Sequence, residues 1–206
     1  MVNTEFVDAL ASDAPVPGGG GGAAYAGALA AALGAMVGNI TARKPKFADA
    51  ADDMRASVAG LDAARARLLE LIDEDAEAFS RLAATWKLSR ATEEEKAARH
   101  AAEQAALVGA CEVPLDIMGE CARIIEVADF LAKNCSKLVL SDVGASAILA
   151  KAALRAAALN VHINTNLMDD AAQAAAFNER CENLLGEPCA AAQKIYDEVA
   201  WALHGA

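Results

Sequence analysis

One carboxylate interrupts an otherwise apolar helical pattern. From Phe47 to Trp86 the apolar residues recur at alternating spacings of three and four, and Asp75 occupies one of these positions. A carboxylate on the buried face of a helix is costly unless it is paired, hydrated or used chemically. We expect Asp75 either to pair with a cation of another helix or to act as an acid/base or ligand-binding group in a cleft. Arg65 lies in the same pattern, but about 15 Å away along the helix, so the two cannot pair within it.

A run of five glycines begins at Gly18 and leads into a helical segment. Backbone N–H groups at the start of a helix attract anions and carbonyl oxygens. Gly18, Gly19 and Gly20 are therefore candidate ligand contacts, with a flexible loop as the alternative. The run lacks the Lys-Ser/Thr ending and the preceding strand of a P-loop, which disfavours nucleotide binding.

The tight basic cluster of the chain is Arg43-Lys44-Pro45-Lys46. It could bind a substrate carboxylate or be a solvated turn. A second candidate carboxylate, Asp142, follows a break in the helical pattern, where an N-cap needs no further function. The three histidines show no metal-ligand spacing, so we predict no metal site.

Helices must position these residues. Alanine accounts for 54 of the 206 residues, whereas there are five prolines and 4% aromatic residues. Alanine is the best helix former and proline the worst. Strictly alternating apolar and polar segments are scarce, which excludes a β sandwich or barrel and disfavours a doubly wound sheet. The predicted fold is all-α: residues 1–206 form a single-domain bundle of long antiparallel helices with a buried Ala/Gly-rich central helix.

Capping residues and prolines predict where the helices begin and end. Thr92 and Glu95 fit a capping box, Pro114 should kink or split the helix that follows, and Ser141 or Asp142 should be an N-cap. The expected helices cover residues 4–11, the Ala/Gly segment up to a break near residue 45, 47–88, 92–134, 145–163, and 170–203 with a potential break at 186–188.

The Ala/Gly segment, residues 14–42, contains no charged side chain. It is long enough to span a bilayer, but it has few large apolar residues to drive insertion. A buried central helix is therefore favoured, and no membrane partner is predicted. Gly27, Gly34 and Gly38 would let a second backbone approach closely, at a helix–helix or subunit contact.

Charge and cysteine content exclude other classes. The net charge is −11 without a basic run, so nonspecific nucleic-acid binding is not expected. Five cysteines without C-x-x-C spacing predict buried thiols rather than a disulfide framework or zinc ribbon. The N-terminal segment lacks a basic region before an apolar core, so no signal peptide is predicted. We expect a cytoplasmic protein.

Several blocks occur in an order that resembles a known family. They are Pro15–Gly20, Gly27–Leu33, Asp75–Phe79, Thr92–Lys96, Ser141–Gly144 and Asn160–Asn164. The chain resembles the formiminotetrahydrofolate cyclodeaminase / methenyltetrahydrofolate cyclohydrolase family over nearly its whole length. The resemblance implies an all-helical homodimer that acts on folates without a metal. Tetrahydrofolate would be the one-carbon carrier within the substrate, so no separate cofactor is implied.

The resemblance leaves two activities open. The segments 134–142 and 163–165 resemble the stand-alone bacterial cyclohydrolases more than the cyclodeaminases. This implies an enzyme that hydrolyses 5,10-methenyltetrahydrofolate to 10-formyltetrahydrofolate. The alternative is a cyclodeaminase, which expels ammonia from 5-formiminotetrahydrofolate to close the methenyl ring. A third possibility is a non-catalytic folate-binding protein on the same scaffold, which two departures support: Gly21 replaces the usual serine, and Pro45 enters the basic segment.

The same resemblance suggests roles for individual residues. One carboxylate could take a proton from the attacking water and return it to a ring nitrogen. The catalytic candidates are Asp75 first and Asp142 second. The substrate-binding candidates are Gly18, Gly19 and Gly20, with Asn39, Asn134 and Asn160 for the pterin and Arg43, Lys44 and Lys137 for the glutamate tail.

Overall fold

A computed structural model describes residues 4–204 and confirms the all-α prediction. No strand occurs in this part of the chain. The elements are α1 (Glu5–Leu10), α2 (Gly19–Ala42), the 3-10 helix η1 (Pro45–Ala50), α3 (Ala51–Thr85), α4 (Glu93–Asn134), the 3-10 helix η2 (Lys137–Val139), α5 (Leu140–Thr165) and α6 (Ala171–His204).

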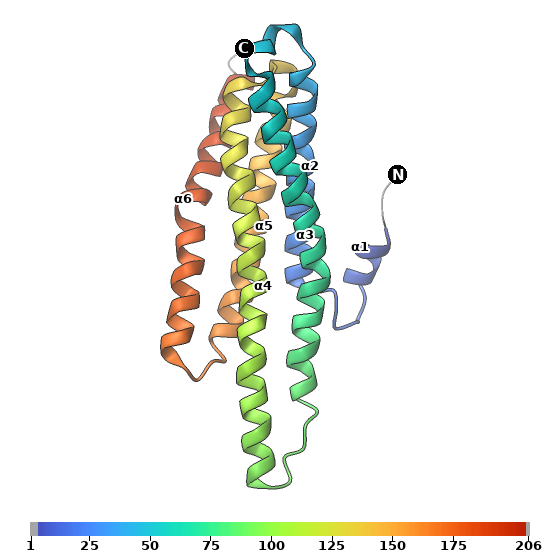
Figure 1. Cartoon of the computed structure of the whole chain (residues 1–206), viewed down its shortest axis with the longest axis vertical. Coiled ribbons are helices and arrows are strands. Elements are labelled where there is room, and N and C mark those ends of the chain that lie inside the picture. The colour runs from blue at the N-terminus through green and yellow to red at the C-terminus, as the bar shows by residue number, and fades with distance from the viewer. Residues whose placement is uncertain (1–3, 205–206) are drawn as a thin grey trace.

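The long helices form an elongated antiparallel bundle (Figure 1). In the view of Figure 1, α3 and α4 form the front layer, and α2 and α5 lie behind them. Helix α2 packs against α3 and α5, and α6 packs against α4 and α5. Because successive helices reverse direction, the start of α2, the last third of α3 and the end of α5 lie at one end of the bundle.

Small residues let α2 lie close to its neighbours. A Cβ atom built on Gly38 would lie 2.5 Å from Val58 Cγ2, and one on Gly27 would lie 3.1 Å from Leu68 Cδ1. The predicted close approach is thus a helix–helix contact with α3. By length and composition α2 could cross a membrane, but 56% of its most apolar window is buried within the bundle. Its apolar surface is used largely in packing, as a central helix requires.

The periodic pattern of α3 is confirmed for most of its members. Arg65 and Trp86 are the exceptions, because both side chains are exposed, and Arg65 pairs with Asp62 at 2.9 Å on the helix surface. The buried positions include Met54, Leu61, Leu68 and Leu82.

Helix α4 begins as predicted but is not split. Thr92 accepts from the Glu95 N–H and Glu95 from the Thr92 N–H, which completes the capping box. Pro114 lies inside the unbroken helix. Proline cannot donate to the carbonyl four residues earlier, and Asn164 Nδ2 donates to that carbonyl, on Ala110, at 2.7 Å. A side chain of α5 thus replaces the missing backbone bond.

Two further helix ends differ from the prediction. Helix α5 begins at Leu140, with Val139 as its N-cap, so neither Ser141 nor Asp142 caps it. The 3-10 turn before α5 is already helical. Asp142 lies in the first turn of α5, where a carboxylate interacts favourably with the positive end of the helix dipole. Helix α6 continues through Pro188 without a break.

All five cysteines are free thiols, four of them buried.

Candidate functional site

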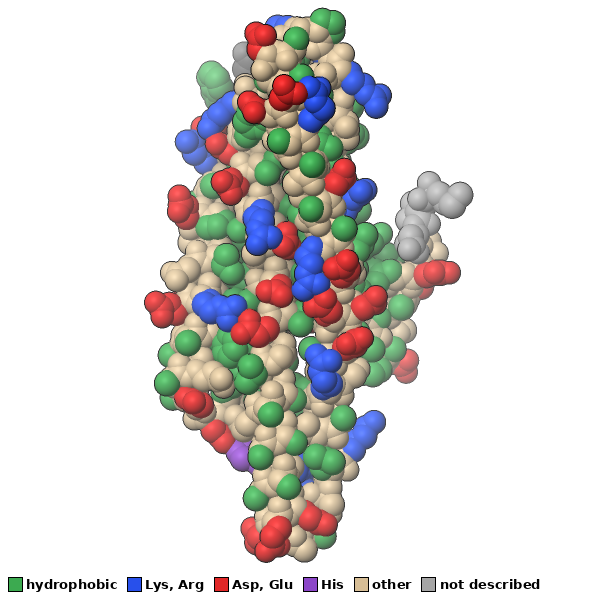
Figure 2. Space-filling model, in the orientation of Figure 1, with side chains coloured by type: hydrophobic (Ala, Val, Ile, Leu, Met, Phe, Trp, Pro, Cys, Tyr) green, Lys and Arg blue, Asp and Glu red, His purple; other side chains and the backbone are tan. Residues whose placement is uncertain are grey.

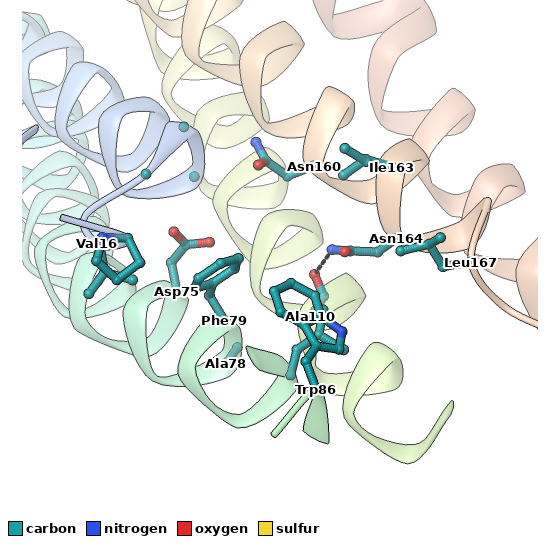
Figure 3. Close-up of a pocket in the computed structure, with 15 residues that line it drawn as sticks. Val16, Asp75, Ala78, Phe79, Trp86, Ala110, Asn160, Ile163, Asn164 and Leu167 are labelled. Carbon is teal, nitrogen blue, oxygen red and sulfur yellow. Dashed lines mark hydrogen bonds between the residues drawn. The ribbon is translucent and has the colours of Figure 1, made fainter. Parts of the chain in front are cut away.

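A cavity of about 270 Å³ opens at the end of the bundle where α2 begins (Figure 3). Four helices and the loop before α2 converge on it. Its lining residues come from this loop and the start of α2 (Pro15, Val16, Gly18, Gly19, Gly20), from α3 and the residue after it (Asp75, Ala78, Phe79, Leu82, Trp86), from α4 (Ala110), and from α5 with the turn beyond it (Asn160, Ile163, Asn164, Leu167).

Asp75 is the one carboxylate of this lining. Its Oδ2 atom accepts a hydrogen bond from the Gly21 backbone N–H at 3.0 Å. Burial raises the pKa of Asp75, and the Gly21 N–H opposes this shift by stabilising the ionised form. No cation forms an ion pair with Asp75 within residues 4–204. The expectation that Asp75 pairs with a cation of another helix is therefore wrong.

The glycine run brings the α2 backbone against this carboxylate. A Cβ atom on Gly20 would lie 2.1 Å from Asp75 Oδ1, so any larger residue there would require this carboxylate or one of the helices to shift. The N–H groups of Gly21 and Gly22 bond to Asp75 and to the Gly18 carbonyl. In the described part of the chain the N–H groups of Gly19 and Gly20 have no acceptor. These two donors are therefore free to bind a ligand in the first turn of α2.

Two asparagines of α5 face the same cavity, one turn apart. Asn160 Nδ2 donates to the Ala156 carbonyl at 3.1 Å, and Asn164 Nδ2 donates to the Ala110 carbonyl at 2.7 Å. Each amide therefore uses a donor on the protein backbone and keeps its Oδ1 as an acceptor. Figure 3 shows both side chains on the cavity side of α5. Asn160 was predicted from the sequence as a site residue and Asn164 was not, although its spacing of four from Asn160 places both on one face of the helix.

An aromatic wall completes the cavity. The rings of Phe79 and Trp86 meet edge to face with centroids 6.0 Å apart. Trp86 Nε1 donates to Glu103 at 3.0 Å, which fixes the indole. Both aromatic residues belong to the periodic pattern that contains Asp75, and this pattern predicted only that they are core residues. Because they share a helix face with Asp75, the sequence could have indicated that they lie at the same site.

Five predicted residues thus come together, and six lie elsewhere. Gly18, Gly19, Gly20, Asp75 and Asn160 line the cavity. Helix α2 has 24 residues, so its two ends are about 35 Å apart at 1.5 Å per residue. The residues at or near the opposite end are Asn39, Arg43, Lys44, Asn134, Lys137 and Asp142. There Lys44 Nζ donates to Ser136 Oγ at 2.7 Å.

The polar groups of the cavity suit a flat, positively charged ligand rich in N–H donors. They are a carboxylate, two amide oxygens and two backbone N–H groups, set against aromatic and aliphatic walls. No Lys or Arg of residues 4–204 lines the cavity. In residues 4–204 no three His, Cys, Asp or Glu side chains meet in a possible metal site.

An all-helical bundle with one carboxylate in a largely apolar cavity belongs to the class of helical small-molecule-binding proteins. A family model of the formiminotransferase-cyclodeaminases matches residues 3–183. A methenyltetrahydrofolate cyclohydrolase of Methylorubrum extorquens is 41% identical over 194 residues, which are 94% of this chain and 93% of that protein. The chain belongs to the formiminotransferase-cyclodeaminase family.

Other relatives are named as cyclodeaminases. A formimidoyltransferase-cyclodeaminase of Sus scrofa is 32% identical over 94% of this chain, which spans 36% of that longer protein. The crystal structure of a formiminotetrahydrofolate cyclodeaminase from Thermotoga maritima superposes with a TM-score of 0.81 at 30% identity. That match covers 100% of this chain and 96% of the other.

Proposed function

We propose that this protein is a methenyltetrahydrofolate cyclohydrolase, which adds water to 5,10-methenyltetrahydrofolate and forms 10-formyltetrahydrofolate. The observation that carries the proposal is Asp75, a carboxylate with a raised pKa that faces an apolar cavity with one oxygen held by the Gly21 N–H. The 41% identity to the Methylorubrum cyclohydrolase over 94% of the chain supports the same activity.

The first step is attack by water on the methenyl carbon. This carbon belongs to an amidinium cation and is already electrophilic, so the reaction requires no metal to activate it. As the new C–O bond forms, the water loses a proton to Asp75 Oδ1. The ionised carboxylate also stabilises the cationic substrate before attack, because opposite charges attract strongly in a cavity of low polarity.

The second step opens the ring. Asp75 returns its proton to N5 while the bond between N5 and the former methenyl carbon breaks. The hydroxyl on that carbon loses its proton and becomes the formyl oxygen on N10. One water is consumed and one proton is released overall, so a single carboxylate can act first as base and then as acid.

The polar groups of the cavity also support binding of the pterin ring at this site. The ring presents N–H donors along one edge, and the Oδ1 atoms of Asn160 and Asn164 are placed as acceptors. The free N–H groups of Gly19 and Gly20 can donate to the ring carbonyl. Phe79 and Trp86 offer faces for stacking, which favours a cationic aromatic ligand.

The cyclodeaminase is the second candidate, because the Thermotoga maritima structure with a TM-score of 0.81 carries that name. The two reactions share the methenyl compound as substrate or product. The same carboxylate would then protonate the departing ammonia.

We also propose that the protein acts as a cytoplasmic homodimer. Exposed apolar side chains on α2 and α5, among them Leu29 and Leu159, support self-association. The net charge of −11 disfavours anionic partners such as nucleic acid or membrane surfaces.

The methenyl absorbance of the purified protein with each substrate tests the proposal. Loss of absorbance from 5,10-methenyltetrahydrofolate faster than in a non-catalytic buffer is the expected result. A gain of absorbance and ammonia from 5-formiminotetrahydrofolate, without the first reaction, would replace the cyclohydrolase by the cyclodeaminase. No change with either substrate would exclude both enzymes and favour a folate-binding protein.

A further inference from the structure

The cavity lies beside an apolar cluster that is separate from the main core. The main core fills the middle of the bundle, whereas Leu82, Leu107 and Ala110 form a second, smaller cluster. Leu82 and Ala110 also line the cavity. Figure 1 shows that the α3/α4 hairpin projects beyond the ends of α5 and α6, and Figure 2 shows the molecule narrowing to this hairpin. The cavity wall on this side therefore rests on fewer neighbouring helices than the main core.

Two residues outside the long helices complete this wall. Trp86 follows the last residue of α3, and Leu167 lies in the turn between α5 and α6. Both line the cavity, and they are 44% and 52% exposed. Together with Leu82 and Ala110 they form the distal wall of the cavity. Because neither side chain is buried, packing alone does not fix their positions, and polar contacts must contribute.

One face of α4 reaches both of these residues. Glu103 and Gln104 lie four and three residues before Leu107, so the three side chains share a helix face. Leu107 is fully buried in the second cluster and anchors this face. Glu103 Oε1 accepts a hydrogen bond from Trp86 Nε1 at 3.0 Å. Glu103 thus holds the indole of the distal wall, and its neighbour Gln104 contacts the turn that carries Leu167.

Gln104 makes two hydrogen bonds with the backbone of this turn. Its Nε2 donates to the Leu167 carbonyl at 3.0 Å, and its Oε1 accepts from the Asp169 N–H at 2.9 Å. Within residues 4–204 neither of these two backbone groups has a backbone partner. A single amide supplies both bonds, because it has a donor and an acceptor side by side. The His100 side chain also contacts the Asp169 carboxylate, but this contact is exposed and stabilises the turn little.

The two ends of the turn are anchored independently of Gln104. The N–H groups of Leu167 and Met168 donate to carbonyls in the last turn of α5, and Asp170 Oδ1 accepts from two N–H groups in the first turn of α6. Met168 packs against both apolar clusters. Loss of the Gln104 bonds would therefore release Leu167 and Asp169 without unfolding the helices on either side.

We propose that Gln104 is a positioning residue of the substrate cavity, which holds Leu167 in the distal wall so that this side chain contacts the bound ligand. The inference rests on the proposed function, because it takes the pterin part of 5,10-methenyltetrahydrofolate as that ligand. Figure 3 shows Leu167 beside Asn164, on the side of the cavity away from Asp75. An apolar contact there is the same before and during attack by water. Its loss should therefore raise KM and leave kcat unchanged.

Two single variants and their combination test whether Gln104 acts through Leu167. Gln104→Met keeps the length and the helix propensity of the side chain but removes both hydrogen bonds. We expect KM for 5,10-methenyltetrahydrofolate to rise about threefold to tenfold, with kcat within about twofold of wild type. Leu167→Ala removes the side chain that is held and should raise KM by a similar factor. Because both changes remove the same contact with the ligand, the double variant should have a KM close to that of the more affected single variant.

Gln193→Met is the matched control. Gln193 Oε1 accepts from Lys151 Nζ at 2.6 Å, and its Nε2 donates to Asp197 Oδ1 at 2.9 Å. This variant therefore also loses two side-chain hydrogen bonds on a long helix, but Gln193 does not line the cavity. It should keep the wild-type KM.

Three kinetic results would overturn the proposal. The first is a wild-type KM for Gln104→Met. The second is a double variant whose KM rises by the product of the two single effects, since Gln104 and Leu167 would then act independently. The third is an equal rise of KM in Gln193→Met, which would show that the loss of any two surface hydrogen bonds has this effect.

Two measurements that need no turnover separate this proposal from the proposed function. In Gln104→Met the Asp169 N–H loses its acceptor, so amide hydrogen exchange over residues 166–170 should be faster, with unchanged exchange in the middle of α5 and α6. Calorimetric titration with tetrahydrofolate should give a Kd raised about threefold to tenfold in the same variant.

The outcomes are distinct. If the wild-type protein binds tetrahydrofolate but converts neither substrate, a raised Kd in Gln104→Met rejects the enzyme and keeps the role of Gln104. Unchanged exchange together with an unchanged Kd overturns the role of Gln104, whether or not the protein is an enzyme. A wild-type protein that does not bind tetrahydrofolate at all overturns both.

Discussion

The Gly21 backbone N–H donates to Asp75 Oδ2 at 3.0 Å across 54 residues of sequence. The contact joins the first turn of α2 to the last third of α3. It holds one carboxylate oxygen on the helix and leaves Oδ1 for the cavity. Because Gly20 has no Cβ atom, the helix can lie directly against this carboxylate. Asp75 is thereby held in a partly apolar site, and no cation of residues 4–204 forms an ion pair with it.

The decrease of kcat/KM at acidic pH should reflect the protonation of Asp75. Burial raises the pKa of this carboxyl above its ordinary value of 3.8. Asp75 must be ionised to accept a proton from water, so kcat/KM should fall as the pH drops through the raised pKa. Initial rates of methenyl loss between pH 4 and 8, corrected for the spontaneous reaction, measure this decrease. A rate that stays constant down to pH 4 would remove Asp75 as the base.

Asp75→Asn should separate catalysis from stability. A raised pKa in the folded state means that ionisation of Asp75 destabilises the fold, and this penalty grows as pH rises through that pKa. Asparagine avoids the penalty and can still accept from the Gly21 N–H. We expect turnover to fall about 10²–10⁴-fold, while Tm rises by a few degrees at pH 7 and matches wild type near pH 3. Thermal scans at both pH values decide this, and a lower Tm at pH 7 would contradict it.

Gly20→Ala should displace the Asp75 carboxylate. The new Cβ atom would lie 2.1 Å from Asp75 Oδ1, so one of the two helices or the side chain must shift. We expect a loss of kcat of about tenfold or more, since small displacements of a catalytic group are costly. Gly60→Ala is the matched control, because nothing lies within 4 Å of its Cβ position. It should stabilise α3 by about 1 kcal/mol and keep the wild-type rate; equal effects of the two changes would refute the argument.

Local patterns made much of this fold predictable. The spacing of apolar residues identified α3, the Thr92 capping box fixed the start of α4, and the anomalous position of Asp75 pointed to the cavity. Each of these signals lies within one or two helical turns. The glycine run at the start of α2 was a candidate site for the same reason, because a helix start exposes N–H groups whatever packs around it.

Long-range contacts could not be predicted in this way. Pro114 was expected to kink or split α4, but a partner 50 residues later in sequence, Asn164, satisfies the carbonyl that it frees. Arg43 and Asp75 were assigned to one site, and the direction of α2 places them at opposite ends of the protomer. Phe79 and Trp86 follow the core pattern, and only the packing of α5 against α3 and α4 makes them a cavity wall.

Gly21→Ser restores the hydroxyl that the family resemblance implies at this position. A Cβ atom there would lie 3.5 Å from Pro17 Cβ and 3.6 Å from Ile72 Cγ2, which are ordinary contacts. The Asp75 hydrogen bond uses the backbone N–H and should survive the change. We therefore expect a folded enzyme with turnover within about threefold of wild type. A large gain of activity would show that the missing hydroxyl limits this chain, and the steady-state rate with 5,10-methenyltetrahydrofolate measures it.

Pro114 should act on substrate binding through Asn164. Because Pro114 has no N–H, the Ala110 carbonyl is free to accept from Asn164 Nδ2 at 2.7 Å, which leaves Asn164 Oδ1 as an acceptor on the cavity. Pro114→Ala supplies a backbone donor to that carbonyl and weakens its hold on the asparagine. We expect KM to rise roughly threefold to tenfold, the range of one hydrogen bond, with little change in kcat and with unchanged or higher Tm.

Pro188→Ala is the matched control for this effect. Pro188 also lies inside a continuous helix, α6, but it does not line the cavity. Its replacement should change Tm in the same direction and leave KM at the wild-type value. If both proline variants raise KM equally, the effect comes from general helix straightening and not from Asn164. If neither does, Asn164 keeps its orientation without Pro114, and its contribution must be measured directly with Asn164→Leu.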